Sequence, residues 1–145
     1  FNAAPVDGKL MEYDLSNIDV LIVNEVEAVA LADTPDPTSA LQNLCVRYPQ
    51  CDVVLSLGKD GLWYGRGGER LRLKAFTVQA VDETAAGDSF VGYFLAAMLR
   101  GLPFDEALLY GSAAGALAVT LPGAAGSIPE ATAVESLVST DDLTF

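Results

Sequence analysis

The sequence predicts an α/β fold in which helices pack on the faces of a sheet. Two continuous apolar runs, 19–23 and 52–57, have the length of buried parallel strands. Residues 70–74 alternate strictly between charged and apolar side chains, which is typical of a half-exposed antiparallel strand. From about Ala86 the apolar residues recur with a helical period instead. This order of strand, helix, strand, hairpin and helices indicates a sheet flanked by helices.

Glycine, proline and short polar residues divide the first half of the chain into short elements. Thr38 or Ser39 can cap a helix that Pro49 stops. We expect, in order, a lead-in over 1–8, a strand over 19–23, helices over 25–31 and from 38 to about 48, a strand over 52–57, a tight turn over 58–61, a strand over 62–64, a hairpin turn over 66–69 and a strand over 70–74.

The second half of the chain is helical. Gly101 marks the end of one helix, because glycine readily adopts the left-handed conformation that closes helices. We expect an extended segment over 76–80, helices over 86–99, from 103 to about 120 and over 130–138, and a Gly/Pro loop over 121–129. No linker divides the 145 residues, so the sequence predicts a single domain over 1–145.

Composition excludes several classes of function. The formal net charge of −12 disfavours binding to nucleic acid or to anionic membranes. No apolar run is long enough for a membrane span and no signal peptide is evident, so we expect a cytoplasmic protein. The chain has no histidine, which rules out Ser-His-Asp triads and histidine zinc sites. Cys45 and Cys51 are interpreted as buried, reduced thiols.

Aromatic and basic side chains have simpler interpretations. We expect the aromatic residues Trp63, Phe90, Tyr93 and Phe94 to lie in the core. The basic residues of the alternating strand are expected to form a solvated face, and they are Arg70, Arg72 and Lys74.

The most informative segment is Val81-Asp82-Glu83-Thr84-Ala85-Ala86-Gly87-Asp88-Ser89-Phe90, in which small residues lead into a helix. A helix N-terminus presents unpaired N–H groups and favours anions such as phosphate. A carboxylate at Asp88, next to a bound phosphate, is explained if it takes a proton from a hydroxyl that attacks the phosphate. Taken alone, the segment fits equally well a turn of small residues with Asp88 or Ser89 as helix cap.

Three further patterns carry similar alternatives. Residues 24–27 (Asn-Glu-Val-Glu) follow a strand and suit phosphate and Mg²⁺, or simply form a helix cap with acids in the first turn. Residues 56–61 could approach the phosphates of a nucleotide, or form an ordinary β-turn. Asp82 and Thr84, with the loop 121–127, could surround a hard cation with oxygen ligands, or form turns without an ion.

Together these motifs resemble those of the ribokinase-like, or phosphofructokinase-B, family of sugar kinases, in the family's order and over nearly the whole chain. Residues 1–5 resemble the segment after a central strand, 24–27 its Asn-x-x-Glu motif, and 56–61 its Thr-Leu-Gly-x-x-Gly motif with Ser for Thr. Residues 82–88 resemble its Asp-Thr-Thr-Gly-Ala-Gly-Asp motif, with Glu83 and Ala85 as departures, and 118–129 its nucleotide and cation loop.

The resemblance implies a three-layer α/β/α ribokinase-like fold, of which this chain is the C-terminal portion without the N-terminal substrate and lid half. It implies ATP as phosphate donor, Mg²⁺ as cofactor and K⁺ as a further cation. The implied roles are Asp88 as catalytic base; an anion hole at Ala85, Ala86 and Gly87; ATP binding by Asn24, Ser56, Gly58, Gly61, Gly87 and Ser112; Mg²⁺ at Glu27; and a monovalent cation at Asp82, Thr84, Ala118, Leu121, Gly123 and Ser127.

The resemblance also implies that a small-molecule sugar is phosphorylated, with ribose favoured by the Ala85-Ala86 form of the motif. Homodimers in the family form through the lid, which this chain lacks. We expect the 145-residue chain to be inactive alone, or active only with the other half. Two alternatives remain: a kinase for a nucleoside or vitamin-precursor alcohol, and a non-catalytic nucleotide-binding or degraded member of the family.

Overall fold

The computed structural model describes residues 1–4 and 12–140 and divides the chain into two compact units, each treated by itself below. Unit 1 is Phe1–Lys74 and unit 2 begins at Ala75. The α/β class and the elements expected from the sequence are confirmed. Within the described residues, no helix combines the length and apolar character that crossing a membrane would need.

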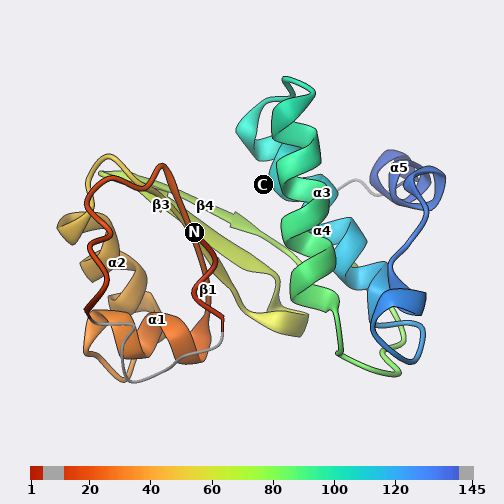
Figure 1. Cartoon of the computed structure of the whole chain (residues 1–145), viewed down its shortest axis with the longest axis horizontal. Helices are drawn as coiled ribbons and strands as arrows, with labels where there is room; N and C mark the ends of the chain where they lie inside the picture. The colour runs from red at the N-terminus through yellow and green to blue at the C-terminus, as the bar shows by residue number, and fades with distance from the viewer. Residues whose placement is uncertain (5–11, 141–145) are drawn as a thin grey trace. The chain divides into compact units, whose positions relative to one another are not determined.

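Unit 1 is a four-stranded sheet with helices α1 and α2 on one face (Figure 1). The strand order is β1-β2-β3-β4, with β1 and β2 parallel and the two later pairs antiparallel. The elements are β1 (Val20–Asn24), α1 (Glu25–Ala32), α2 (Pro37–Arg47), β2 (Asp52–Ser56), the short 3₁₀ helix η2 (Gly58–Asp60), β3 (Leu62–Arg66) and β4 (Glu69–Leu73).

The N-terminal residues extend this sheet beyond β1. Asn2 forms a parallel bridge with Ile22, and the Ile22 N–H donates to the Phe1 carbonyl at 2.9 Å. The predicted lead-in over 1–8 is therefore partly strand-like at residues 1–3, and residues 5–8 lie outside the described part of the chain.

The start of α2 corrects one prediction. The N-cap is Asp36, whose carboxylate accepts from the Ser39 N–H at 2.7 Å and from its hydroxyl at 2.8 Å. Thr38 and Ser39 lie inside the helix instead, because Pro37 occupies the first helical position, where its missing N–H costs nothing.

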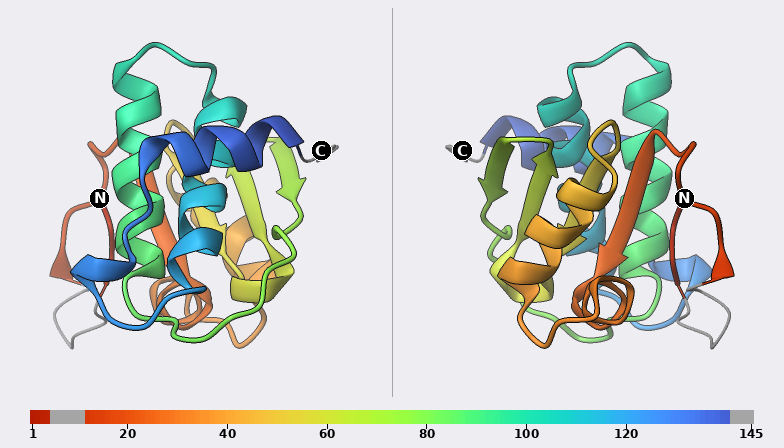
Figure 2. Two further views of the ribbon diagram at one scale, coloured as in Figure 1. Left: turned by 90° about the vertical axis from the view of Figure 1, so that its right-hand side faces the viewer. Right: turned by 90° about the vertical axis from the view of Figure 1, so that its left-hand side faces the viewer.

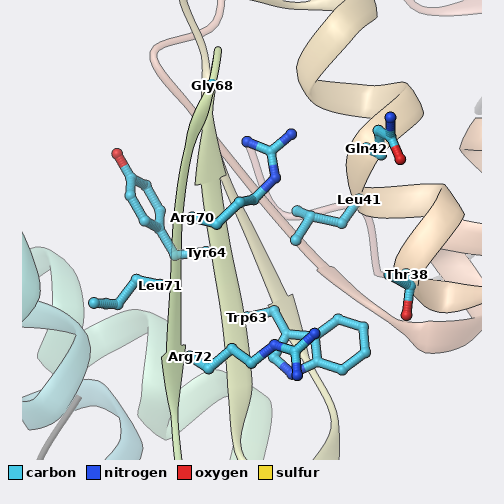
Figure 3. A pocket seen from close by; sticks show the side chains of 9 residues that line it. All are labelled: Thr38, Leu41, Gln42, Trp63, Tyr64, Gly68, Arg70, Leu71 and Arg72. Atoms are coloured by element: carbon cyan, nitrogen blue, oxygen red, sulfur yellow. The ribbon is translucent and has the colours of Figure 1, made fainter.

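The hairpin of β3 and β4 has the predicted two-residue turn at Gly67-Gly68. Trp63 pairs with Arg72 across the strands, and the Arg72 guanidinium lies 4.6 Å from the centroid of the indole (Figure 3). Trp63 is half-buried, so its predicted place in the core holds only in part. The predicted solvated face is confirmed, because Arg70, Arg72 and Lys74 are all exposed.

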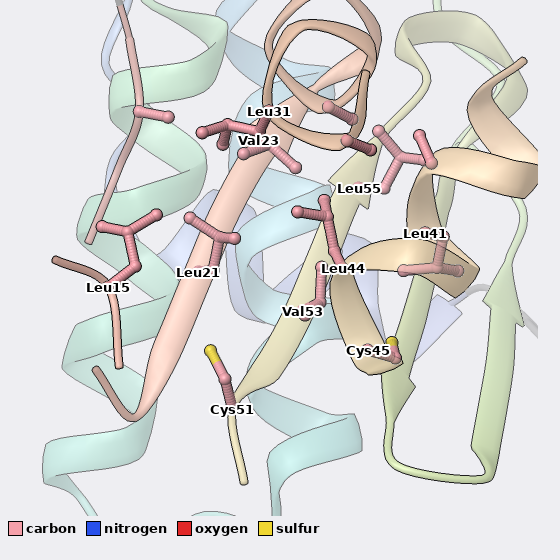
Figure 4. Packing of buried hydrophobic residues seen from close by; sticks show 14 of the residues in the cluster. Leu15, Leu21, Val23, Leu31, Leu41, Leu44, Cys45, Cys51, Val53 and Leu55 are labelled. Atoms are coloured by element: carbon pink, nitrogen blue, oxygen red, sulfur yellow. The ribbon is translucent and has the colours of Figure 1, made fainter. Parts of the chain in front are cut away.

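The core of unit 1 lies between the sheet and its two helices (Figure 4). Leu21 and Val23 of β1 alternate with residues on the other face and contact α1 and α2, as do Val53 and Leu55 of β2. Cys45 and Cys51 are buried free thiols in the same cluster, as predicted. Burial raises the pKa of the Cys51 thiol to about 11, so it stays protonated at neutral pH.

Unit 2 is built from three helices, α3 (Ala86–Leu99), α4 (Phe104–Ala118) and α5 (Ala131–Thr140), with the short 3₁₀ helix η3 (Ala125–Ser127) between the last two. α4 packs along α3 and also contacts α5 (Figure 2). Phe94 is fully buried and contacts Phe90 and Phe104, with ring centroids 6.0 and 5.3 Å away. Phe90 and Phe94 are thus core residues as predicted, whereas Tyr93 is half-buried and donates to the Pro129 carbonyl at 2.6 Å.

Candidate functional site

In unit 1, the predicted nucleotide-binding residues gather at one edge of the sheet. β1 and β2 are parallel and end in register, so Asn24 and Ser56 are direct neighbours at the carboxyl ends of their strands. The Ser56 hydroxyl donates to the Val23 carbonyl at 3.4 Å. Ligands of α/β sheets bind outside this edge, so the place suits a small-molecule site.

Asn24 and Glu27 bind one another in a reciprocal helix cap. The Asn24 side-chain oxygen accepts from the Glu27 N–H at 2.9 Å. The two Glu27 carboxylate oxygens accept from the Asn24 N–H at 2.8 Å and from its side-chain amide at 3.0 Å. Glu27 is only 3% exposed, whereas Asn24 is exposed. The capping interpretation of this motif is therefore confirmed, and it fixes how the Asn24 amide is presented.

The turn after β2 keeps its backbone open to solvent. Gly58 has a φ of +54° and Gly61 a φ of +93°, conformations that disfavour residues with a side chain. The Gly61 N–H donates to the Gly58 carbonyl at 3.1 Å and the Leu57 N–H to the Gly61 carbonyl at 2.8 Å. Apart from its neighbours in the chain, no described atom lies within 4 Å of the place that a Cβ at Gly58 would take. A ligand can therefore approach this backbone closely.

In unit 2, the start of α3 has no side-chain cap. Ala85 occupies the N-cap position in the left-handed conformation, with φ 62° and ψ 4°. The Ala86 N–H donates to the Glu83 carbonyl at 3.3 Å and the Ser89 N–H to the Ala85 carbonyl at 2.9 Å. Between them, the N–H groups of Gly87 and Asp88 donate to no described residue. They are the orphan donors that an anion at a helix N-terminus accepts from.

Asp88 lies in the first turn of α3 with an exposed side chain and forms no hydrogen bond or ion pair with the described residues. The alternative interpretation, in which Asp88 or Ser89 caps the helix, is therefore excluded. Ala85 is the N-cap and the helix begins at Ala86, as predicted, so Asp88 lies in the first helical turn and not at the capping position. Its oxygens are thus available to a ligand.

The Asp82 carboxylate is hydrogen-bonded to two other residues of the predicted cation site, Thr84 and Gly123. One carboxylate oxygen accepts from the Thr84 N–H at 2.9 Å and from its hydroxyl at 2.6 Å, and the other accepts from the Gly123 N–H at 2.8 Å. These bonds, with that to the Thr84 hydroxyl largest, lower the pKa of Asp82 to about 2. The loop 121–127 is thereby tied to the segment before α3.

Further hydrogen bonds close the same loop. The Ser127 hydroxyl donates to the carbonyls of Gly123 at 2.7 Å and Ala124 at 2.8 Å, and Ser127 is fully buried. The Ala118 carbonyl accepts from the Leu121 N–H at 3.3 Å. The side-chain and carbonyl groups of this loop present oxygen atoms, the kind of ligand that a hard cation prefers. Within the described residues there is no cluster of three or more cysteine or acidic side chains that could hold a metal.

The structure thus assembles the predicted site residues in two groups, one in each unit. Unit 1 carries Asn24, Glu27, Ser56, Gly58 and Gly61 at the sheet edge. Unit 2 carries the start of α3 with Asp88, the Asp82 cluster, and Ser112, which is half-buried on α4.

Two features of unit 2 escape sequence reasoning. The Val119 carbonyl accepts from the N–H groups of Val81 at 2.7 Å and Asp82 at 3.1 Å, a backbone contact with no signal in side-chain types. The Ser89 hydroxyl is buried and has no partner among the described residues. Its place one residue after Asp88 is the only hint that the sequence carries.

Comparison with known proteins places these motifs in a family. Residues 3–131 match the model of the pfkB family carbohydrate kinases. The chain is 42% identical over 119 residues to ribokinase from Haemophilus influenzae, covering 79% of this chain and 39% of that protein.

Solved structures agree with this match. Ribokinase from Thermotoga maritima has a TM-score of 0.85 at 32% identity, covering 97% of this chain and 48% of that one. Arabidopsis thaliana ribokinase, solved with ribose and ATP, has a TM-score of 0.79 at 30% identity, covering 88% and 43%. The chain spans less than half the length of each of these relatives. The ribokinase fold is thereby confirmed, and the chain belongs to the pfkB family of carbohydrate kinases.

Proposed function

We propose that this chain supplies the ATP-binding and catalytic part of a sugar kinase. The observation that supports this most is the start of α3. There the exposed carboxylate of Asp88, which has no partner among the described residues, lies beside the orphan N–H groups of Gly87 and Asp88 itself. A base and an anion-binding backbone are the two groups that transfer of a phosphoryl group to a hydroxyl requires.

In the proposed reaction, Asp88 accepts the proton of a sugar hydroxyl. The hydroxyl oxygen attacks the γ-phosphorus of ATP in line, a new P–O bond forms, and the bond to the leaving ADP oxygen breaks. The N–H groups of Gly87 and Asp88 stabilise the charge that develops on the phosphoryl oxygens, whereas the predicted anion-hole residue Ala86 already donates its N–H to the Glu83 carbonyl. The proposed ATP contacts are Asn24, Ser56, Gly58 and Gly61 in unit 1, and Gly87 and Ser112 in unit 2.

Mg²⁺ fits the donors of the Asn24–Glu27 pair. Each Glu27 oxygen accepts one hydrogen bond from Asn24 and keeps a further lone pair, and Mg²⁺ prefers oxygen ligands and retains several waters. Because Glu27 is almost fully buried, we propose that it holds the ion through water. When bound, Mg²⁺ neutralises phosphate charge. We propose K⁺ as the cation bound by the oxygen-rich loop formed around Asp82 and Ser127.

The proposed acceptor is ribose, supported by the match to ribokinases. Acceptor recognition falls to residues outside this chain, since the chain spans less than half of those relatives. Because the residues that recognise the acceptor lie outside this chain, a nucleoside or a vitamin-precursor alcohol is the second candidate acceptor. We propose a cytoplasmic location, because the two thiols are reduced and the reaction needs ATP. We propose a homodimer because the chain resembles family members that dimerise through the lid.

The test measures ADP release against a panel of sugars and nucleosides, using the protein as its gene encodes it and its Asp88→Asn variant. We expect turnover with one acceptor and a loss of about 10²- to 10⁴-fold in kcat in the variant, because a general base is removed. ATP affinity, measured by calorimetry, should change little.

The matched control is Asp105→Asn, which removes an exposed carboxylate from the first turn of α4. This variant keeps full activity if the loss at Asp88 reflects chemistry and not helix stability. ATP binding without turnover of any acceptor would instead support a non-catalytic nucleotide-binding protein.

A further inference from the structure

A groove of about 310 Å³ lies in unit 1 between α2 and the hairpin of β3 and β4 (Figure 3). None of its residues belongs to the proposed kinase site. The side chains that face it come from both sides and are Thr38, Leu41, Gln42, Trp63, Arg70 and Arg72.

Strand alternation explains why these side chains share one side. Trp63 is paired with Arg72, and Gly65 with Arg70, so the indole and both guanidinium groups emerge on the α2 side of the hairpin. Tyr64 and Leu71 also border the groove, but Figure 3 shows them directed to the opposite side. Gly65 has no side chain, and a Cβ there would meet the Cys45 sulfur at 2.7 Å. The groove therefore has one aromatic wall and a basic rim.

The basic rim lies in a stretch of the chain that is rich in basic residues. Four of the eight basic residues of the chain fall between residues 66 and 74, where Glu69 is the only acid. Arg66 forms an ion pair with Asp52 at 3.0 Å, whereas neither Arg70 nor Arg72 forms one with a described residue. One guanidinium nitrogen of Arg70 donates hydrogen bonds to the carbonyls of Gly67 and Glu69, and the other N–H groups of this guanidinium donate to no described residue.

The remaining polar groups also suit an anion. Asp36, the acid at the start of α2, does not line the groove and accepts two hydrogen bonds from Ser39 on one carboxylate oxygen, Oδ2. Thr38 and Gln42 can donate from a hydroxyl and an amide. Leu41 contributes apolar surface opposite the indole.

We propose that this groove binds a small organic anion that carries a flat apolar body, namely a carboxylate or phosphate ester on an aromatic ring. The anionic head pairs with Arg70 and Arg72, since guanidinium groups match both heads in charge and in geometry. The ring lies between Leu41 and Trp63. The concave shape, apolar walls and few convergent polar groups are those of small-molecule sites.

Trp63 is the only tryptophan of the chain, so its fluorescence reports on the groove directly. The whole chain is titrated with phenyl phosphate and, separately, with benzoate, which distinguish the two heads. We expect a saturable change in emission with a Kd at or below about 1 mM for at least one of them. Inorganic phosphate should bind at least about tenfold more weakly, because it lacks the apolar body.

Arg70→Gln and Arg72→Gln should each weaken binding about tenfold, because each removes a charge-assisted hydrogen bond. Calorimetry provides the second readout, since Arg72 stacks on the indole and its loss changes the emission itself. Arg100→Gln, at an exposed ion pair with Glu135 in unit 2, is the matched control and should leave binding unchanged.

Three results would overturn the proposal, provided that circular dichroism shows the chain folded. The first is no saturable response to either aromatic anion up to about 10 mM. The second is equal affinity in the Arg70→Gln/Arg72→Gln double variant. The third is inorganic phosphate binding as tightly as phenyl phosphate, which would leave only a non-selective basic surface.

Discussion

Asp82 accepts three hydrogen bonds, and each of them is stronger when its carboxylate is ionised. The pKa of Asp82 is accordingly about 2 in the folded chain, below the value near 3.9 of a free aspartate. Since the folded carboxyl binds its proton less tightly, Asp82 stabilises the fold above pH of about 4. This contribution is lost as the pH falls from about 4 to about 2.

The first prediction concerns this carboxyl. NMR titration should show Asp82 still mostly ionised at pH of about 3. In Thr84→Ala, which removes the hydroxyl donor with the largest effect, the Asp82 titration should move to higher pH. Asp82→Asn should unfold more easily than the wild-type chain at pH 7, with a difference that shrinks toward pH of about 2. An unchanged titration in Thr84→Ala would refute this account.

At the scale of single residues, the sequence predicted local hydrogen bonds better than backbone conformation. Asn24 and Glu27 have the spacing of a capping box, so their mutual hydrogen bonds follow from local chemistry. Asp88 was a plausible cap by residue type, and the helix starts at Ala86 as predicted, but the left-handed turn at Ala85 makes Ala85 the N-cap. Backbone conformation of this kind is set by tertiary contacts, which residue type alone does not reveal.

Among the elements, α3 begins at a strained residue. The left-handed conformation of Ala85 costs about 1–2 kcal/mol relative to glycine. Ala85→Gly should therefore raise the free energy of unfolding by up to about 1 kcal/mol, because the relief exceeds the added entropy of the unfolded chain.

The control is Ala86→Gly, one residue later, where the conformation is helical and glycine should destabilise by about 0.5–1 kcal/mol. Urea denaturation of both variants measures the difference. If both variants changed the free energy of unfolding in the same direction, Ala85 would not be strained in solution.

The packing of α3 on α4 predicts opposite effects for two glycines. A Cβ at Gly111 of α4 would lie 3.0 Å from the ring and from the carbonyl oxygen of Phe90 on α3. At Gly92 of α3, no atom lies within 4 Å of the place that a Cβ would take. Gly111→Ala should destabilise by about 0.5–1.5 kcal/mol, since overpacking outweighs the gain in helix propensity.

Gly92→Ala should instead stabilise by about 0.5–1 kcal/mol, because only the propensity term applies. Thermal unfolding of the two variants provides the comparison. If the two variants were equally stabilised, α3 and α4 would be able to move apart to admit the methyl group at position 111 without a cost in free energy.

The elements themselves were largely predictable. The apolar runs became β1 and β2, and the charged alternation became β4, because burial on a pleated strand imposes a period of two. α2 was misplaced at its start, although Pro37 at the first helical position was a usable signal. The stacking of Arg72 on Trp63 was missed. It follows from the register that the Gly67-Gly68 turn fixes, so it required the hairpin geometry and not the strand pattern.

For the whole molecule, the dominant electrostatic fact is a net charge of −12 on 145 residues. Among the described residues there are two ion pairs, Arg66–Asp52 at 3.0 Å and Arg100–Glu135 at 3.7 Å. Most acids are therefore unpaired and repel one another in the folded state more than in the expanded unfolded chain. The same field would repel the nucleotide of the proposed function at long range, so its binding would depend on the short-range N–H donors and the Mg²⁺ proposed above.

Because repulsion between the unpaired acids outweighs the attraction in the two ion pairs, we expect added salt to stabilise the protein. Raising NaCl from about 10 to about 300 mM at pH 7 shortens the screening length from roughly 30 Å to under 10 Å, and Tm should rise by several degrees. Most of the rise should come below about 150 mM, which separates screening from general salt effects. At pH of about 4, where carboxylates begin to be protonated, the same step should raise Tm less. A fall in Tm with salt at pH 7 would mean that the two ion pairs and the charges at helix ends outweigh the repulsion, and that the acids are arranged to avoid one another.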